Sequence, residues 1–76
     1  MEINISKIDI NQRPTWYITF SNNHIHDVYE WIKENMPYQW AEQGIAIWYL
    51  LPGHPTGTLL LTREEDVTLF MLRWTD

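Results

Sequence analysis

The sequence contains no cysteine, three glycines and five basic residues among its 76 positions. Without cysteine, neither a disulfide framework nor a thiolate zinc site can stabilise the fold. The glycines, Gly44, Gly53 and Gly57, form no phosphate-binding loop. No run approaches 18 consecutive apolar residues, and Met1 is followed by Glu2 rather than by the basic start of a signal peptide. These absences predict a cytoplasmic protein that does not bind membranes.

Acidic side chains outnumber basic ones by ten to five, which gives a formal net charge of −5. This charge repels phosphate backbones and therefore disfavours direct binding of nucleic acid. It is compatible with docking on a basic protein surface, and equally with a role in solubility alone.

Aromatic residues are plentiful, with five tryptophans and four tyrosines. A chain of this length buries only about 60% of the surface that its unfolded form exposes. Each buried aromatic side chain removes roughly 150–250 Å² from water, so a few of them suffice for a core. We therefore expect one domain, residues 1–76, with an aromatic-rich core.

Residue alternation predicts a β-hairpin at the start of the chain. In residues 2–10 the isoleucines occupy odd positions up to Ile5 and even positions from Ile8, which predicts a bulge near residues 6–7. A turn at residues 11–14 leads to a second strand, in which Pro14 takes the first position. That strand has a period of two, with Trp16, Ile18 and Phe20 on one side and Tyr17 and Thr19 on the other.

A helix is predicted to follow, capped by residues 21–23 and ended by Pro37. Residues 37–44 then form an aromatic loop. The helical spacing predicts one buried stripe, with Trp31 at its boundary. The stripe consists of Ile25, Val28, Tyr29, Ile32 and Met36.

The second half is predicted to hold a strand, a turn, a strand and a helix. Residues 45–51 are apolar at both alternating sets of positions, which is typical of a central strand covered on both sides. The turn-rich residues 52–57 lead into a strand at residues 58–61. A capping-box spacing predicts a helix over residues 63–70, with a strand as the alternative there because the segment is also rich in β-formers. Residues 72–74 are predicted as a last short strand.

This order gives the α+β class. After the extra N-terminal strand, the elements follow the ferredoxin-like βαββαβ pattern. We expect an antiparallel sheet with two helices on one face.

The C-terminal part, residues 60–74, contains an acidic turn and ends in an aromatic tail. It resembles the tails of small bacteriophage accessory proteins, in which an "EEDA" turn precedes "FKLRW". Val67 stands where that pattern has alanine, and Met71 where it has lysine. The match covers about a fifth of the chain and consists of Glu64, Glu65, Asp66, Phe70, Leu72, Arg73 and Trp74.

The resemblance implies a phage origin and a way of acting. Small phage accessory proteins often bind a host enzyme or a defence complex. The resemblance brings no catalytic residue with it.

Neither catalysis nor metal binding is indicated by the polar residues. His24 and His26 project about 200° apart on a helix, so they cannot chelate one ion there, and His54 is distant in sequence. The acidic pairs lie on a predicted solvated helix face or in a helix's first turn, where acids are favoured anyway. We therefore expect no enzyme activity, metal or cofactor.

The aromatic residues exceed what two helices and a sheet are expected to cover. We predict Trp31, Tyr38 and Trp40 as anchors of a protein interface, with Glu30 and Glu34 as an acidic rim that steers the domain to a basic patch. The competing interpretation is an unusually tryptophan-rich core.

The resulting hypothesis is a phage-encoded, non-enzymatic protein that binds and inhibits a host protein. The alternative is a self-associating subunit that uses the second face of residues 45–51 or an open sheet edge. Two weaker hypotheses are a DNA mimic that blocks a nucleic-acid-binding protein, and a single-stranded RNA platform with Tyr17 and Trp48 on the open sheet face.

Overall fold

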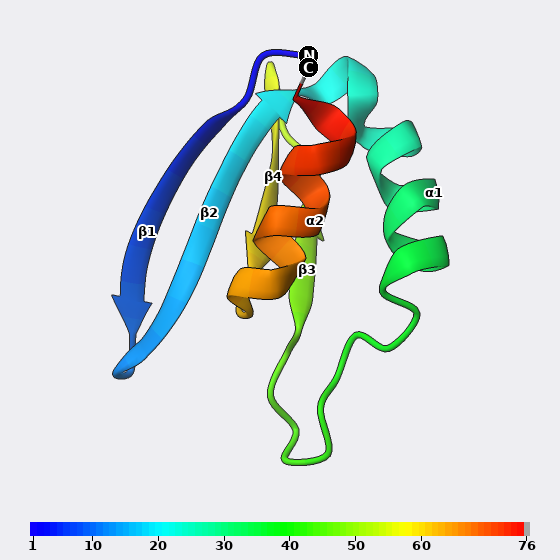
Figure 1. Cartoon of the computed structure of the whole chain (residues 1–76). Coiled ribbons are helices and arrows are strands. Elements are labelled where there is room, and N and C mark those ends of the chain that lie inside the picture. Colours follow the sequence, from blue (N-terminus) through cyan, green and yellow to red (C-terminus); the bar gives the residue numbers. More distant parts are fainter. Residues whose placement is uncertain (76) are drawn as a thin grey trace.

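The computed structural model describes residues 1–75 and has a four-stranded antiparallel sheet with two helices on one face (Figure 1). The strands occur in the order β1-β2-β4-β3. The predicted α+β class and its ferredoxin-like arrangement are confirmed. The elements are β1 (Asn4–Ile10), β2 (Arg13–Ser21), a 3₁₀ turn η1 (Asn22–His24), α1 (Ile25–Asn35), β3 (Trp48–Leu51), β4 (Thr56–Leu61) and α2 (Glu64–Trp74).

A two-residue turn joins β1 to β2. Asn11 and Gln12 both have positive φ, 52° and 66°, which is the type I′ geometry that suits the twist of a hairpin. The register runs without interruption from Asn4–Thr19 to Ile10–Arg13, so the predicted bulge is wrong. Every residue of β1 is exposed, so burial does not hold the strand's isoleucines to one face.

The predicted first helix is confirmed, preceded by the 3₁₀ turn. The Ser21 hydroxyl accepts a hydrogen bond from the backbone N–H of Asn23, at 3.3 Å. Val28 and Ile32 are fully buried, as the stripe predicts, but Tyr29 is exposed. Its ring lies beside the Lys33 ammonium group instead, 4.5 Å from nitrogen to ring centroid.

The predicted central strand is wrong in its place and its length. Strand β3 begins at Trp48 and forms an edge of the sheet, with β4 as its single partner. Trp48 faces the helices and is buried, whereas Tyr49 and Leu51 lie on the other face and are exposed. Both alternating sets of positions in residues 45–51 are apolar, but the helices cover only one face of β3. The other face is apolar and uncovered.

The last element is helical throughout, which decides between helix and strand for residues 63–70 and makes the predicted strand at 72–74 wrong. In the ferredoxin-like arrangement a last strand pairs beside the first strand of the βαβ unit, here β2. That edge of β2 is already occupied by β1. Trp74 packs instead against Trp31 of α1 and Phe70, at centroid distances of 6.4 and 6.1 Å.

The core lies between the sheet and the two helices. The indole N–H of Trp48 donates to the Met36 carbonyl oxygen at 3.0 Å, which ties the end of α1 to β3. Within residues 1–75 neither helix has the length and apolar character needed to cross a bilayer. The buried core consists of Ile18, Phe20, Val28, Ile32, Met36, Ile47, Trp48, Leu59, Leu61, Val67 and Phe70.

Candidate functional site

The face of the sheet opposite the helices is here called the open face. Side chains alternate along a strand, so the neighbours of the buried residues Ile18, Leu59 and Trp48 project from it. Among its strand residues the single charged side chain is that of Arg13. The open-face positions are Asn4, Ser6, Ile8, Ile10, Arg13, Thr15, Tyr17, Thr19, Ser21, Tyr49, Leu51, Thr56, Thr58 and Leu60.

Apolar side chains gather at the centre of this face. The strand register places Tyr17 opposite Leu60 and Leu60 opposite Tyr49, so these three form one row across β2, β4 and β3. The Trp40 ring meets the Tyr49 ring edge to face, with 5.7 Å between centroids and 88° between planes. We call this surface the open-face patch, which consists of Ile8, Ile10, Tyr17, Trp40, Tyr49, Leu51 and Leu60.

A depression of about 370 Å³ adjoins the patch. The apolar part of its lining comes from Tyr49, Leu60 and Ile10, and Arg13 also lines it. Ile45 and Ala46 also line it. The Thr62 hydroxyl holds this segment by donating hydrogen bonds to the carbonyl oxygens of Ala46 and Ile47, at 2.8 and 3.2 Å. The depression can accept an apolar side chain from a partner.

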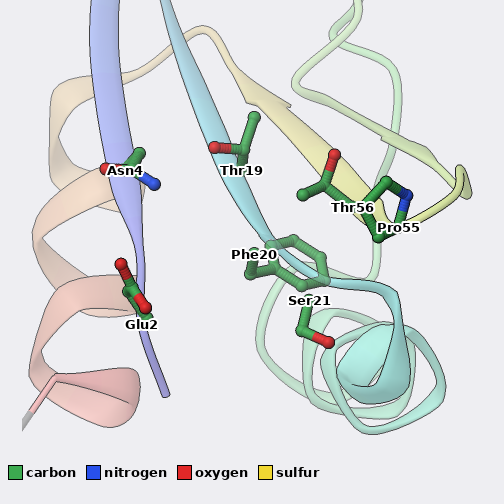
Figure 2. Close-up of a pocket in the computed structure, with 7 residues that line it drawn as sticks. All are labelled: Glu2, Asn4, Thr19, Phe20, Ser21, Pro55 and Thr56. Atoms are coloured by element: carbon green, nitrogen blue, oxygen red, sulfur yellow. The ribbon is translucent and has the colours of Figure 1, made fainter.

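A second depression, of about 300 Å³, lies at the other end of the sheet (Figure 2). Figure 2 shows Asn4 at the start of β1 and Glu2 in the segment before it, with Thr19 and Ser21 on β2 and Pro55 and Thr56 beyond them. Its lining includes a single carboxylate and no second acid or base. General acid–base catalysis needs a positioned proton donor and acceptor, and this lining does not supply the pair.

The predicted site residues on α1 lie on the helix side. Trp31 is half-buried between the helices, where its ring meets Phe70 edge to face at 5.7 Å. Glu30 and Glu34 lie near it and line a groove with Arg73. Glu30 also pairs with the Lys33 ammonium group at 3.4 Å. Trp31 is thus a packing residue, and the two glutamates flank it on the helix surface.

The other two predicted anchors lie in the loop after α1. Tyr38 is 77% exposed and Trp40 is 53% exposed. Because Trp40 contacts Tyr49, it belongs with the open face, whereas Trp31 lies on the helix side. The structure therefore does not bring the predicted anchors and acidic rim together on one surface.

The surplus of tryptophan is mostly a feature of the core. Trp16, Trp31, Trp48 and Trp74 are buried or packed against the core, which leaves Trp40 as the exposed one of the five. The predicted placement of Trp48 on the open face is wrong, whereas Tyr17 does lie there. Sequence reasoning missed Tyr49, Leu60 and the Ile8–Ile10 pair. The signal for Tyr49 was the two-sided apolar pattern of residues 45–51, which was interpreted as burial on both sides.

Within the described part of the chain no three His, Asp or Glu side chains are grouped closely enough to hold a metal ion. His26 lies 3.9 Å from a Glu30 carboxylate oxygen on the solvated surface of α1.

A comparison of the chain with protein-family models, with curated proteins and with solved structures finds no match.

Proposed function

We propose that this domain is a non-enzymatic protein-binding domain that docks its open face on another protein. The observation that carries the proposal is the open-face patch, an uncovered apolar surface centred on the Trp40–Tyr49 pair. Contiguous exposed apolar surface on a small domain is typical of interaction sites. Tryptophan and tyrosine are enriched among the residues that dominate interface energies.

The geometry of the patch favours binding a preformed partner surface. Tyr17, Leu60 and Tyr49 are held by paired strands, so little backbone freedom is lost when they are covered. The surrounding hydroxyl side chains, such as those of Thr19 and Thr58, can donate and accept hydrogen bonds at the rim. Arg13, the single charge among the strand residues of the open face, can pair with a partner's carboxylate.

The proposed biological role is inhibition of a host protein or defence complex in the host cytoplasm by a phage-encoded protein. The support for this role is the resemblance of residues 60–74 to phage accessory proteins.

Glu30 and Glu34 have a lesser part in this proposal. They lie on α1, on the side away from the open face, and do not touch a partner docked there. Their contribution is long-range attraction to a basic partner. Neutralising them should therefore change the association rate and its salt dependence, with little effect on dissociation.

A pull-down from bacterial lysate, followed by measured affinity for the captured protein, tests the proposal. Trp40→Ala should weaken binding by about 2 kcal/mol or more, roughly thirtyfold, and leave the domain folded. Leu72→Ala is the matched control, because Leu72 is equally apolar and 77% exposed but lies on α2. If the Trp40→Ala variant and the wild type bound the captured protein with equal affinity, docking through the open face would be contradicted.

A further inference from the structure

Strand β1 presents a long free edge. It lies at one end of the sheet, and all seven of its residues are exposed. Natural proteins usually protect such an edge with a bulge, a proline or charged side chains of one kind, above all lysine. The charges of β1 are one lysine and one aspartate, Lys7 and Asp9, so they can attract a second copy of the strand as well as repel it. Strand β1, which lies at the outer edge of the sheet in Figure 1, has no proline, and its register with β2 is unbroken. By contrast, the β3 edge is four residues long, and the Gln39 side chain covers part of it by donating to the Trp48 carbonyl oxygen at 3.2 Å.

The hairpin turn determines which backbone groups face this edge. In a two-residue hairpin the residues flanking the turn, Ile10 and Arg13, form a hydrogen-bonded pair. Such pairs alternate along an antiparallel ladder, so the even residues of β1 bond to β2. The N–H and C=O groups of Ile5, Lys7 and Asp9 therefore point to the free edge.

We propose that β1 pairs antiparallel with β1 of a second copy of this chain, around a two-fold axis at Ile8. In this register Lys7 lies directly opposite Asp9 of the second copy, and the symmetry repeats the pair. Lys7 and Asp9 carry outward-pointing backbone groups, so both pairs are also hydrogen-bonded pairs. The two sheets become one eight-stranded sheet with all four helices on the same side.

Charge selects this register among the alternatives. A two-fold axis at Lys7 would place two lysines opposite each other, and an axis at Asp9 would do the same with two aspartates. Like charges directly opposite destabilise a strand pair, whereas opposite charges stabilise it. An axis at Ser6 would leave Lys7 facing Ile5. Within residues 1–75 neither Lys7 nor Asp9 forms a salt bridge. The Lys7 ammonium group lies over the Trp16 ring, 5.4 Å from its centroid, and this contact leaves its charge without an acidic partner.

The proposed dimer leaves the open face accessible and extends it. Ile8 meets its own counterpart, and Ile10 lies opposite Ser6, so the isoleucines of both copies meet at the centre of the enlarged face. The dimer does not depend on the proposed docking function. It would present two open-face patches side by side to a partner.

Disulfide trapping tests the register directly, because the chain has no cysteine of its own. At a non-hydrogen-bonded pair the Cα atoms are about 4.5 Å apart, within the range that a disulfide spans. Ile8→Cys, treated with oxidised glutathione, should give a covalent dimer in high yield. Ile10→Cys is the matched control, since the Cα atoms of its two copies would lie about 14 Å apart and the variant should stay monomeric. Equal yields from the two variants, or no dimer from Ile8→Cys, would overturn the proposal.

Charge reversal with sedimentation equilibrium tests the pairing by a second route. Lys7→Asp alone and Asp9→Lys alone should each raise the dimer dissociation constant by roughly tenfold, because two favourable pairs become two repulsive ones. The double variant, K7D together with D9K, should restore wild-type dimerisation and so excludes misfolding as the cause. A wild-type chain that stays monomeric up to millimolar concentration, or single variants that dimerise as well as the wild type, would contradict it.

Discussion

The turn between β1 and β2 places Gln12 at a φ of 66°, in the left-handed region. A side chain with a Cβ atom costs roughly 1–2 kcal/mol in this conformation, and glycine avoids that cost. Glycine also gains freedom in the unfolded chain, which offsets part of the benefit. Gln12→Gly should therefore raise the free energy of unfolding by about 0.5–1 kcal/mol, as measured by urea denaturation.

The control for this substitution is Gln43→Gly, at an exposed loop residue whose φ is not positive. It should give no gain or a small loss, because only the unfolded-state effect operates there. A loss of stability in Gln12→Gly would show that the turn does not have this geometry in solution.

Asp66 is a buried carboxylate at the start of α2. It accepts a hydrogen bond from Arg63 Nε at 2.8 Å, and this bond raises the pKa of Arg63 above its usual value. The carboxylate also lies in the helix's first turn, where the helix dipole favours negative charge. Asp66→Ala should lower the free energy of unfolding by about 1–3 kcal/mol.

Glu65→Ala provides the comparison, because Glu65 is a neighbouring acid with a 71% exposed side chain and a longer contact of 3.8 Å to Arg63. Exposed ion pairs of this kind contribute little, so its loss should cost less than about 1 kcal/mol. Similar costs for the two substitutions, measured by thermal unfolding, would contradict the structural role of Asp66.

At the scale of whole elements, local patterns were sufficient where one face is buried and the other is solvated. The period of two over Trp16, Ile18 and Phe20, and the spacing of Val28 and Ile32, predicted β2 and α1 correctly. They failed where long-range pairing decides the outcome. The end of α2 is helical because β1 already occupies the edge of β2 at which a last strand would pair. The local sequence of residues 72–74 contains no information about that pairing.

The helical form of the C-terminal residues makes a testable prediction. In a strand Leu72 and Trp74 would share one face, whereas in α2 Leu72 is exposed and Trp74 packs on Trp31 and Phe70. Trp74→Ala should therefore destabilise the domain by about 3 kcal/mol, and Leu72→Ala by less than about 0.5 kcal/mol. Large losses from both substitutions in urea denaturation would favour the strand.

For the molecule as a whole, the candidate site was only partly predictable. Composition indicated more aromatic surface than a small fold covers, and Trp40 is exposed as predicted. Four tryptophans belong to the core, however. Trp31 and Trp74 pack edge to face between the two helices, and Trp16 and Trp48 lie on the strands that the helices cover. Which face of β3 the helices cover is a tertiary property, so Tyr49 could not be identified from the alternation alone.

Charge is also distributed unevenly over the molecule. The acids of α1 and α2 lie on the helix side, and among the strand residues of the open face Arg13 is the single charge. Covering the open face costs little solvation energy, because it is apolar and carries little charge. Covering the helix side would require its carboxylates to lose their hydration, which opposes close packing on that side. This division favours the open face as the surface that binds.

Site-specific photo-crosslinking in bacterial cells tests the docking of the open face most directly. The photoreactive residue p-benzoylphenylalanine is placed at Tyr49 on the open face or at Tyr29 on α1. These two tyrosines are equally exposed, at 40% and 42%, but lie on opposite sides of the molecule. Docking through the open face predicts an adduct with one host protein from position 49 and none from position 29. Adducts from position 29 alone, the same adducts from both positions, or no adduct from position 49 would contradict it.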